Sequence, residues 1–174
     1  MVFSMTHIMN TQRLTLIECT LNNIAGTPPK KSTILNDIIT VLSPNVVSHL
    51  PANFHGITTI NNAKNWLINM LEQSRVFAVS DVHSNTTLGF VFMHNSDTNQ
   101  YHIGYLFAQA HWGKGYAQEA LSAFITWCKS TPNIKELIAG VEKDNLASIT
   151  VLKKIGFTFH SEGLHSMRFY TRVL

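Results

Sequence analysis

Hydrophobic and polar positions along the chain follow two periods, which separate strands from helices. Alternating polar and apolar positions predict seven strands, at residues 13–17, 75–82, 87–94, 101–107, 136–141, 157–164 and 167–173. Apolar positions three and four apart predict helices at residues 34–42, 63–71, 117–130 and 146–155. Small polar residues precede the first two helices and are expected to cap them, namely Ser32 or Thr33, and Asn61 or Asn62.

These elements follow one another without a linker, an internal repeat or a low-complexity segment, which indicates one mixed α/β (α+β) domain. The polar stretch 83–86 is predicted to join two strands as a hairpin turn, and residues 22–29 are expected to form a loop. The chain has 174 residues, of which 45% are hydrophobic, and this suits a single core better than two small ones. We expect the domain to occupy residues 11–174, after an N-terminal extension of residues 1–10.

Composition and charge narrow the classes of function. The net charge is +3 and the lysines and arginines do not cluster, so nucleic-acid binding is not indicated. The chain has neither a run of about 20 apolar residues, which a membrane span needs, nor the pattern of a secretion signal. A cytoplasmic protein without membrane partners is therefore expected. Cys19 and Cys128 are expected to be buried thiols, and the nine histidines lack the spacing of a metal site.

Two glycines lie between the strand at 101–107 and the helix that follows it. The string there is Ala108-Gln109-Ala110-His111-Trp112-Gly113-Lys114-Gly115-Tyr116-Ala117. The first turn of a helix exposes unpaired backbone N–H groups and the positive end of the helix dipole. Because Gly113 and Gly115 carry no side chain, an anion can approach that backbone closely. The pattern therefore predicts a phosphate-binding loop.

On this string alone, other kinds of loop stay open. A nucleotide-binding P-loop needs the spacing Gly-x-x-x-x-Gly-Lys-Ser/Thr, which is absent. A dinucleotide-binding turn needs Gly or Ala where Gln118 stands, although Glu142, after the next strand, could imitate its ribose-binding acid. A tight strand-to-helix turn without any ligand would carry the same two glycines.

A second pattern follows the strand at 136–141. Asn145-x-x-Ser148 opens a helix, and Lys154-x-Gly156-Phe157 ends it and begins a strand. Together with Trp112-Gly113-Lys114-Gly115-Tyr116-Ala117, this pattern resembles the GNAT acetyltransferase superfamily. Within that superfamily, Gln12-Arg13-Leu14-Thr15-Leu16 and Ile103-Gly104-Tyr105-Leu106 resemble the RimJ/RimL branch of protein N-terminal acetyltransferases. The resemblance begins at about residue 11 and covers the rest of the chain.

The resemblance implies a GNAT fold and a coenzyme A site. In that fold, a mixed, mostly antiparallel twisted sheet of about seven strands carries flanking helices. Its fourth and fifth strands, here 101–107 and 136–141, splay apart so that the pantetheine arm can insert and pair with the strand backbone. The residues that would contact the cofactor are Leu106, Phe107, Ala108, Trp112, Gly113, Lys114, Gly115, Tyr116, Ala117, Asn145 and Lys153. For the two lysines, which would contact outer phosphates, a solvated side chain is the alternative.

The acid that protonates the leaving thiolate also follows from the resemblance. Many relatives carry a Tyr seven residues after the asparagine for this purpose, but Leu152 stands there in this chain. Tyr105 and Tyr116 are not at that place in the sequence. The RimJ/RimL branch uses a serine at the position of Ser148, which is therefore the predicted acid. The alternative is that Ser148 is merely a small residue at a helix interface.

The expected reaction is transfer of an acetyl group from acetyl-CoA to a primary amine by direct attack. The amine must first lose a proton, and His102 and Glu142, which flank the expected gap, are the predicted bases; a surface position is the alternative for each. The resemblance favours a protein or peptide N-terminus as acceptor. A polyamine or aminoglycoside is the alternative, although Asp37 is the only acidic residue in the region 22–62. A non-catalytic CoA-binding sensor is the alternative from another class. A homodimer is compatible with the family.

Overall fold

The computed structural model of the chain describes residues 8–21, 30–95 and 100–174. They form one sheet of eight strands in the order β1-β2-β3-β4-β5-β6-β8-β7. The strands are β1 (Ile8–Asn10), β2 (Leu14–Glu18), β3 (Arg75–Asp81), β4 (Thr87–Asn95), β5 (Gln100–Phe107), β6 (Glu136–Glu142), β7 (Thr158–Glu162) and β8 (Met167–Val173). Every neighbouring pair is antiparallel except β5 and β6, which are parallel. The predicted mixed, mostly antiparallel sheet is therefore confirmed.

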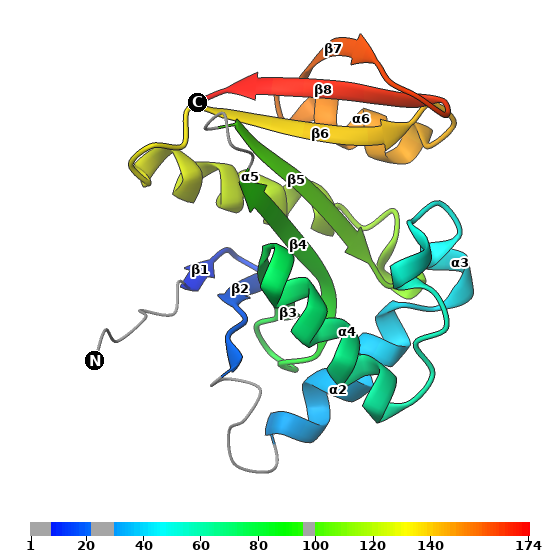
Figure 1. Ribbon diagram of the computed structural model, residues 1–174. Coiled ribbons are helices and arrows are strands. Elements are labelled where there is room, and N and C mark those ends of the chain that lie inside the picture. The colour runs from blue at the N-terminus through cyan, green and yellow to red at the C-terminus, as the bar shows by residue number, and fades with distance from the viewer. Residues whose placement is uncertain (1–7, 22–29, 96–99) are drawn as a thin grey trace.

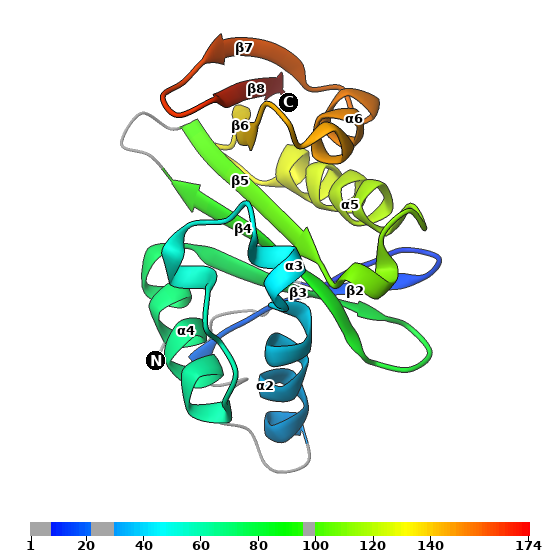
Figure 2. The ribbon, with the colours of Figure 1, turned by 90° about the vertical axis from the view of Figure 1, so that its right-hand side faces the viewer.

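Helices cover both faces of this sheet. They are α2 (Lys30–Val41), α3 (Pro44–Val47), α4 (Ile60–Gln73), α5 (Tyr116–Ser130) and α6 (Leu146–Lys154), with the 3-10 turns η1 (Ala52–Phe54) and η2 (Gln109–His111). Figure 2 shows α2 and α4 on one face and α5 and α6 on the other. Because side chains alternate along a strand, β5 contributes to both cores. Leu106 packs into the core beneath α2 and α4, and Ile103 and Phe107 pack into the core beneath α5 and α6.

The predicted strands and helices are all present, with ends that differ by a few residues. The predicted caps are wrong. α2 begins at Lys30, so Ser32 and Thr33 lie inside it. α4 is capped by Thr59, whose Oγ1 accepts a hydrogen bond from the N–H of Asn62 at 3.1 Å. The predicted loop at 22–29 lies outside the described residues.

Some elements were not predicted, because they are too short to display a period. They include β1, which pairs with β2 and lies inside the segment expected to be an N-terminal extension. They also include α3, which begins at Pro44, the residue predicted only to stop the preceding helix. The burial expected for Cys19 and Cys128 is confirmed, and it raises the pKa of each thiol to about 12. In the described part of the chain, no helix has the length and apolar character needed to cross a bilayer.

Candidate active site

The two parallel strands β5 and β6 begin side by side and then separate. Their pairing joins residues 100–103 with residues 136–139. Beyond these residues, β5 continues to Phe107 and β6 to Glu142 with no further pair between them. Figure 1 shows the two strands diverging toward the side on which α3 lies. On its other edge β6 stays paired with β8 along its whole length, so the separation is confined to one seam, and the predicted splay is confirmed.

The main chain of β5 presents alternate residues to this gap. In an antiparallel pair, every second residue directs both its N–H and its C=O group toward the same neighbour. The N–H of Ala108 donates to the carbonyl of Leu88 at 2.9 Å, and the register with β4 keeps Leu106 in the same phase. The main-chain groups of Leu106 and Ala108 therefore face β4, whereas those of Tyr105 and Phe107 face the gap. Of the three strand residues predicted to bond pantetheine, only Phe107 has this orientation.

The loop between β5 and α5 needs its glycines because of their backbone angles. Gly113 has a φ of +72° and Gly115, which precedes α5, has a φ of +79°. Residues with side chains rarely adopt these left-handed values. A Cβ atom added at Gly113 would meet no described atom within 4 Å, so the surface above it is open. The indole of Trp112 holds the loop against the strand end by donating from Nε1 to the carbonyl of Phe107 at 2.8 Å.

An arginine and a glutamate tie this loop to the start of β2. Glu119, in the first turn of α5, accepts hydrogen bonds from the hydroxyl of Thr11 at 2.6 Å and from Nε of Arg13 at 2.6 Å. The guanidinium of Arg13 also donates to the carbonyl of Lys114 at 3.1 Å and lies 4.5 Å from the centroid of the Tyr116 ring. Burial acts to raise the pKa of Glu119, but the hydrogen bonds outweigh it, so the pKa is lowered. Thr11 and Arg13, near the N-terminus of the chain, thus hold this loop in place.

The start of α6 faces the same seam. Asn145 caps this helix, since its Oδ1 accepts from the N–H of Ser148 at 3.1 Å. Tyr105 reaches across from β5, and its hydroxyl donates to the main-chain oxygen of Ser148 at 3.2 Å. Burial raises the pKa of Tyr105 to about 12, with a hydrogen bond to Ser148 acting in the opposite direction, so this phenol keeps its proton at neutral pH. Lys153 lies in the last turn of α6, at the end opposite Asn145.

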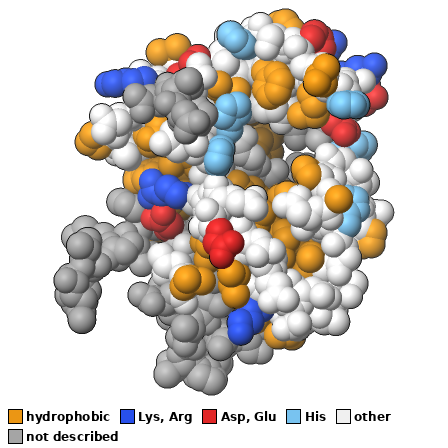
Figure 3. All heavy atoms as spheres, in the orientation of Figure 1, with side chains coloured by type: hydrophobic (Ala, Val, Ile, Leu, Met, Phe, Trp, Pro, Cys, Tyr) orange, Lys and Arg blue, Asp and Glu red, His pale blue; other side chains and the backbone are white. Residues whose placement is uncertain are grey.

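A pocket of about 480 Å³ opens beside β5 on the face that α4 covers. Its walls come from residues 102–106 of β5, the end of α4 and residues 50–54. His102, one of the predicted bases, lies in the wall, and so does His94. Among the lining residues there is no Lys, Arg, Asp or Glu. Figure 3 shows the surface hollowed between the part that carries β6, β8 and α6 and the part below it, with histidine side chains on both sides of the hollow.

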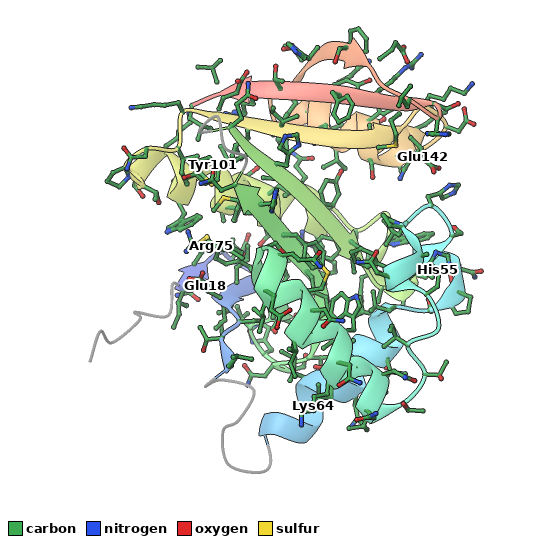
Figure 4. All side chains as sticks on the ribbon, viewed as in Figure 1. Glu18, His55, Lys64, Arg75, Tyr101 and Glu142 are labelled. Atoms are coloured by element: carbon green, nitrogen blue, oxygen red, sulfur yellow. The ribbon has the colours of Figure 1, made fainter. Side chains whose placement is uncertain are left out.

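Glu142, the other predicted base, stands at the end of β6 (Figure 4). It lies on the side toward residues 44–49, which comprise α3 and the two residues after it and are called the α3 segment below. Its Oε2 lies 2.7 Å from Nδ1 of His49, which follows α3. In α3 itself, Nδ2 of Asn45 donates to Oε1 of Gln109, just beyond β5, at 2.9 Å. The α3 segment therefore contacts the ends of both strands that border the gap, and it spans the gap's open end.

A sequence comparison with known families agrees with this geometry. The profile of the acetyltransferase (GNAT) domain family matches residues 31–158. The chain belongs to the GNAT acetyltransferase family. Among curated relatives, YkkB of Bacillus subtilis is 42% identical over 57 residues, which are 33% of this chain and 33% of that protein. The chain spans between 33% and 65% of the lengths of the curated relatives it matches.

Solved GNAT structures share the fold over nearly the whole chain. RimL, a ribosomal L7/L12 alpha-N-protein acetyltransferase in complex with coenzyme A, has a TM-score of 0.76 at 16% identity, covering 97% of this chain and 98% of its own. The microcin C7 self-immunity acetyltransferase MccE, in complex with acetyl-CoA and AMP, has a TM-score of 0.71 at 17% identity, covering 94% of each chain. At these identities the likeness concerns the fold alone.

Two residues of this candidate site were missed from the sequence. Tyr105 was set aside because it does not follow Asn145 at the usual spacing, yet the fold brings its hydroxyl to α6. Its place among the odd-numbered, α6-facing residues of β5 is a signal that could have found it. His49 lies in a segment without a hydrophobic period, and no pattern linked it to Glu142, 93 positions away.

Proposed function

We propose that the chain transfers an acetyl group from acetyl-CoA to a primary amine, which attacks the bound thioester directly. The observation that carries this proposal is the opening of the β5–β6 seam beside the turn formed by Gly113 and Gly115. Coenzyme A has two matching parts, an extended pantetheine arm with amide groups and a pyrophosphate. The complexes of RimL with coenzyme A and of MccE with acetyl-CoA support the choice of cofactor.

The pantetheine amides would bond the main chain of β5 where it faces the gap, at Tyr105 and at the N–H of Phe107, whose carbonyl already accepts from Trp112. Leu106 and Ala108, whose main-chain groups face β4, would shape this wall without bonding the arm. The pyrophosphate would lie on the first-turn N–H groups of α5 and on the loop before it. The residues that would hold it are Trp112, Gly113, Lys114, Gly115, Tyr116 and Ala117. Asn145 would contact the arm from its place at the start of α6, and Lys153 an outer phosphate.

The leaving thiolate needs a proton, and Ser148 is the proposed donor. It lies in the first turn of α6, half-buried, at the seam through which the arm would pass. Tyr105 supports this position by its hydrogen bond to the main-chain oxygen of Ser148. The tyrosine hydroxyl is the second candidate donor at this seam, and its one proton would first have to leave its hydrogen bond to Ser148.

We assign the acceptor amine to the pocket beside β5. Its described walls are largely apolar and hold no carboxylate or ammonium group. A polyamine or an aminoglycoside would have to bring several ammonium groups against these walls, and an unpaired buried charge is costly. A peptide N-terminus brings one amine flanked by neutral groups, and an α-amine loses its proton near pH 8 whereas a lysine does so near 10.4. The pocket therefore favours a protein or peptide N-terminus as acceptor.

A thiol-release assay tests this function. The chain is mixed with acetyl-CoA and with matched panels of peptides, polyamines and aminoglycosides, while calorimetry measures the binding of coenzyme A. We expect coenzyme A to bind and peptides with small or apolar first residues to release the thiol fastest. Fast turnover of a polycationic amine instead would overturn the acceptor class. Tight binding of acetyl-CoA with no turnover of any amine would indicate a sensor.

A further inference from the structure

A histidine–carboxylate pair lies at the open end of the β5–β6 gap. Nδ1 of His49 is 2.7 Å from Oε2 of Glu142, with 57% of the histidine side chain and 39% of the glutamate side chain exposed. The two residues come from different walls, because His49 follows α3 and Glu142 ends β6. The hydrogen bond between Asn45 and Gln109 holds α3 to the β5 side of the same opening. The imidazole is therefore held at this opening from two sides, and solvent or a ligand can reach it.

The geometry of the pair determines which ring nitrogen is available. A carboxylate accepts hydrogen bonds, so Nδ1 of His49 carries the proton and donates it to Glu142. In the neutral ring, Nε2 is then the nitrogen that has a free lone pair and can accept a proton. The next residues along the chain, Leu50 and Pro51, line the pocket beside β5. His49 itself is not among the residues that line the pocket, but it directly precedes Leu50, which is.

We propose that His49 is the general base that deprotonates the acceptor amine, and that Glu142 is the positioning residue that fixes its ring. This proposal rests on the acetyl transfer proposed above. Nε2 of His49 takes one proton from the acceptor ammonium, and the freed lone pair forms a C–N bond to the thioester carbonyl carbon. The tetrahedral intermediate then breaks its C–S bond, and the sulfur leaves with the bonding pair and takes a proton from Ser148. The nitrogen gives up its second proton as the amide forms, and this proton restores the hydroxyl of Ser148. His49 returns its proton to water.

The pair suits this step better than either base predicted from the sequence. An imidazole, with a reference pKa of about 6.5, accepts a proton from an ammonium group more readily than a carboxylate does, with a reference value of about 4.3. Glu142 already accepts a hydrogen bond from His49, so its carboxylate is engaged in orienting the ring. His102 lies in the pocket wall, and no carboxylate is shown bonded to it in the described part of the chain. A histidine oriented by a carboxylate is a recurrent arrangement of general bases.

Other ionisable groups stand around the pair and bear on any titration. His55 is on the same segment, and its Nε2 lies 2.9 Å from the carbonyl of Leu50. Lys143 and Asp144 follow Glu142 in the turn before α6. His102 is in the pocket wall, and His111 is in η2, two residues after Gln109, which Asn45 contacts. The experiment must therefore compare single substitutions and cannot assign a pH limb from the wild type alone.

The test is the pH dependence of kcat/KM for His49→Gln and Glu142→Gln, measured from pH 5.5 to 9.5 on the best acceptor peptide. For His49→Gln we expect a loss of about 100-fold at pH 7, partly regained at high pH where the amine loses its proton unaided. For Glu142→Gln we expect a loss of about tenfold at pH 7, because the ring of His49 loses the carboxylate that orients it. Both variants should bind coenzyme A within about twofold of the wild type, by calorimetry.

His160→Gln is the matched control. It is an exposed histidine on β7, which β8 separates from β6, and this variant should leave the pH profile unchanged. A loss in His49→Gln that is equal at every pH would indicate only a contact that closes the opening and would overturn the proposal. An unchanged profile, or a limb that disappears in His102→Gln instead, would also overturn it. If the wild type acetylates no amine at all, the proposed function fails together with this base; equal rates in the wild type and His49→Gln reject the base alone.

Discussion

The two sides of the β5–β6 gap present different kinds of chemical group, backbone amides on one and side chains on the other. On the proposed cofactor side, the groups are backbone amides of β5, of the glycine loop and of the start of α5, and Gly113 and Gly115 take left-handed backbone angles there. On the proposed acceptor side, the groups are side chains: His49 and Glu142, which contact each other, and His102, which lines the pocket. A binding site made of backbone groups can be recognised in the sequence, because only glycine readily adopts the left-handed backbone angles it needs. A binding site made of side chains from distant segments has no such pattern in the sequence.

The largest expected effect is a loss of affinity for coenzyme A. In the double variant Gly113→Val and Gly115→Val, we expect the affinity for coenzyme A to fall by about 100-fold, because a left-handed backbone costs a residue with a side chain about 1–2 kcal/mol at each position. Calorimetry measures the loss. Gly104→Ala is the control, since its φ is not positive and the nearest heavy atom to its new Cβ is 3.8 Å away. Undiminished binding by the double variant would contradict a phosphate site at this loop.

The next effect is confined to the acceptor side. Gly104 lies in the wall of the pocket, and leucine there would place its branched end in the space assigned to the acceptor. For Gly104→Leu we expect KM for the acceptor peptide to rise by about tenfold, while the affinity for coenzyme A stays within twofold. Steady-state kinetics and calorimetry separate the two quantities. If KM is unchanged, the acceptor binds elsewhere.

A third prediction compares Ser148 with Tyr105, which meet where α6 faces β5. If Ser148 protonates the thiolate, Ser148→Ala lowers kcat by about tenfold without changing the affinity for coenzyme A. Tyr105→Phe removes one hydrogen bond, so it should lower the free energy of unfolding by about 1 kcal/mol and reduce kcat less than Ser148→Ala does. Ser122→Ala, on the exposed face of α5, is the matched control. A larger loss of kcat in Tyr105→Phe would transfer the role of proton donor to the tyrosine.

The smallest expected effect concerns the support of the loop. The pKa of Glu119 is lowered in the folded chain, so its stabilisation is complete above the pKa of an unfolded glutamate, about 4.3, and is lost as pH falls through the folded value. For Glu119→Gln we expect a loss of about 1 kcal/mol at pH 7, kept small because Arg13 is 41% exposed. Thermal melts at pH 7 and below pH 4 measure it. A difference that does not shrink in acid would contradict a role for the charge.

The strands and long helices were predictable from the sequence, whereas the capping residues and the orientation of individual strand residues were not. The strands and long helices follow from spacing alone, because burial of one face imposes a period. The cap of α4 was misplaced among three neighbouring polar residues, since Thr59, Asn61 and Asn62 are all good caps. The orientation of Leu106 and Ala108 depends on the register of β5 with β4, which the hydrophobic period within β5 does not reveal.

The side chains that meet across the gap were beyond prediction for a different reason. Tyr105 meets Ser148 because the single parallel pair places α6 beside β5, and no short-range pattern encodes that contact. His49 meets Glu142 because α3, which begins at Pro44, brings the residues after it to the end of β6. Both contacts join residues that are far apart in sequence, where spacing carries no signal.

The seam that opens after Ile103 also links stability to ligand concentration. Beyond that point two strand edges lack each other as partners, and a pantetheine arm would act there as an inserted strand. A ligand that binds only the folded chain stabilises it by mass action, by about 2.7 kcal/mol at 100 times its dissociation constant. For a chain of 174 residues this raises the melting temperature by about 5–10 °C. The protein would then be most resistant to unfolding when acetyl-CoA is abundant.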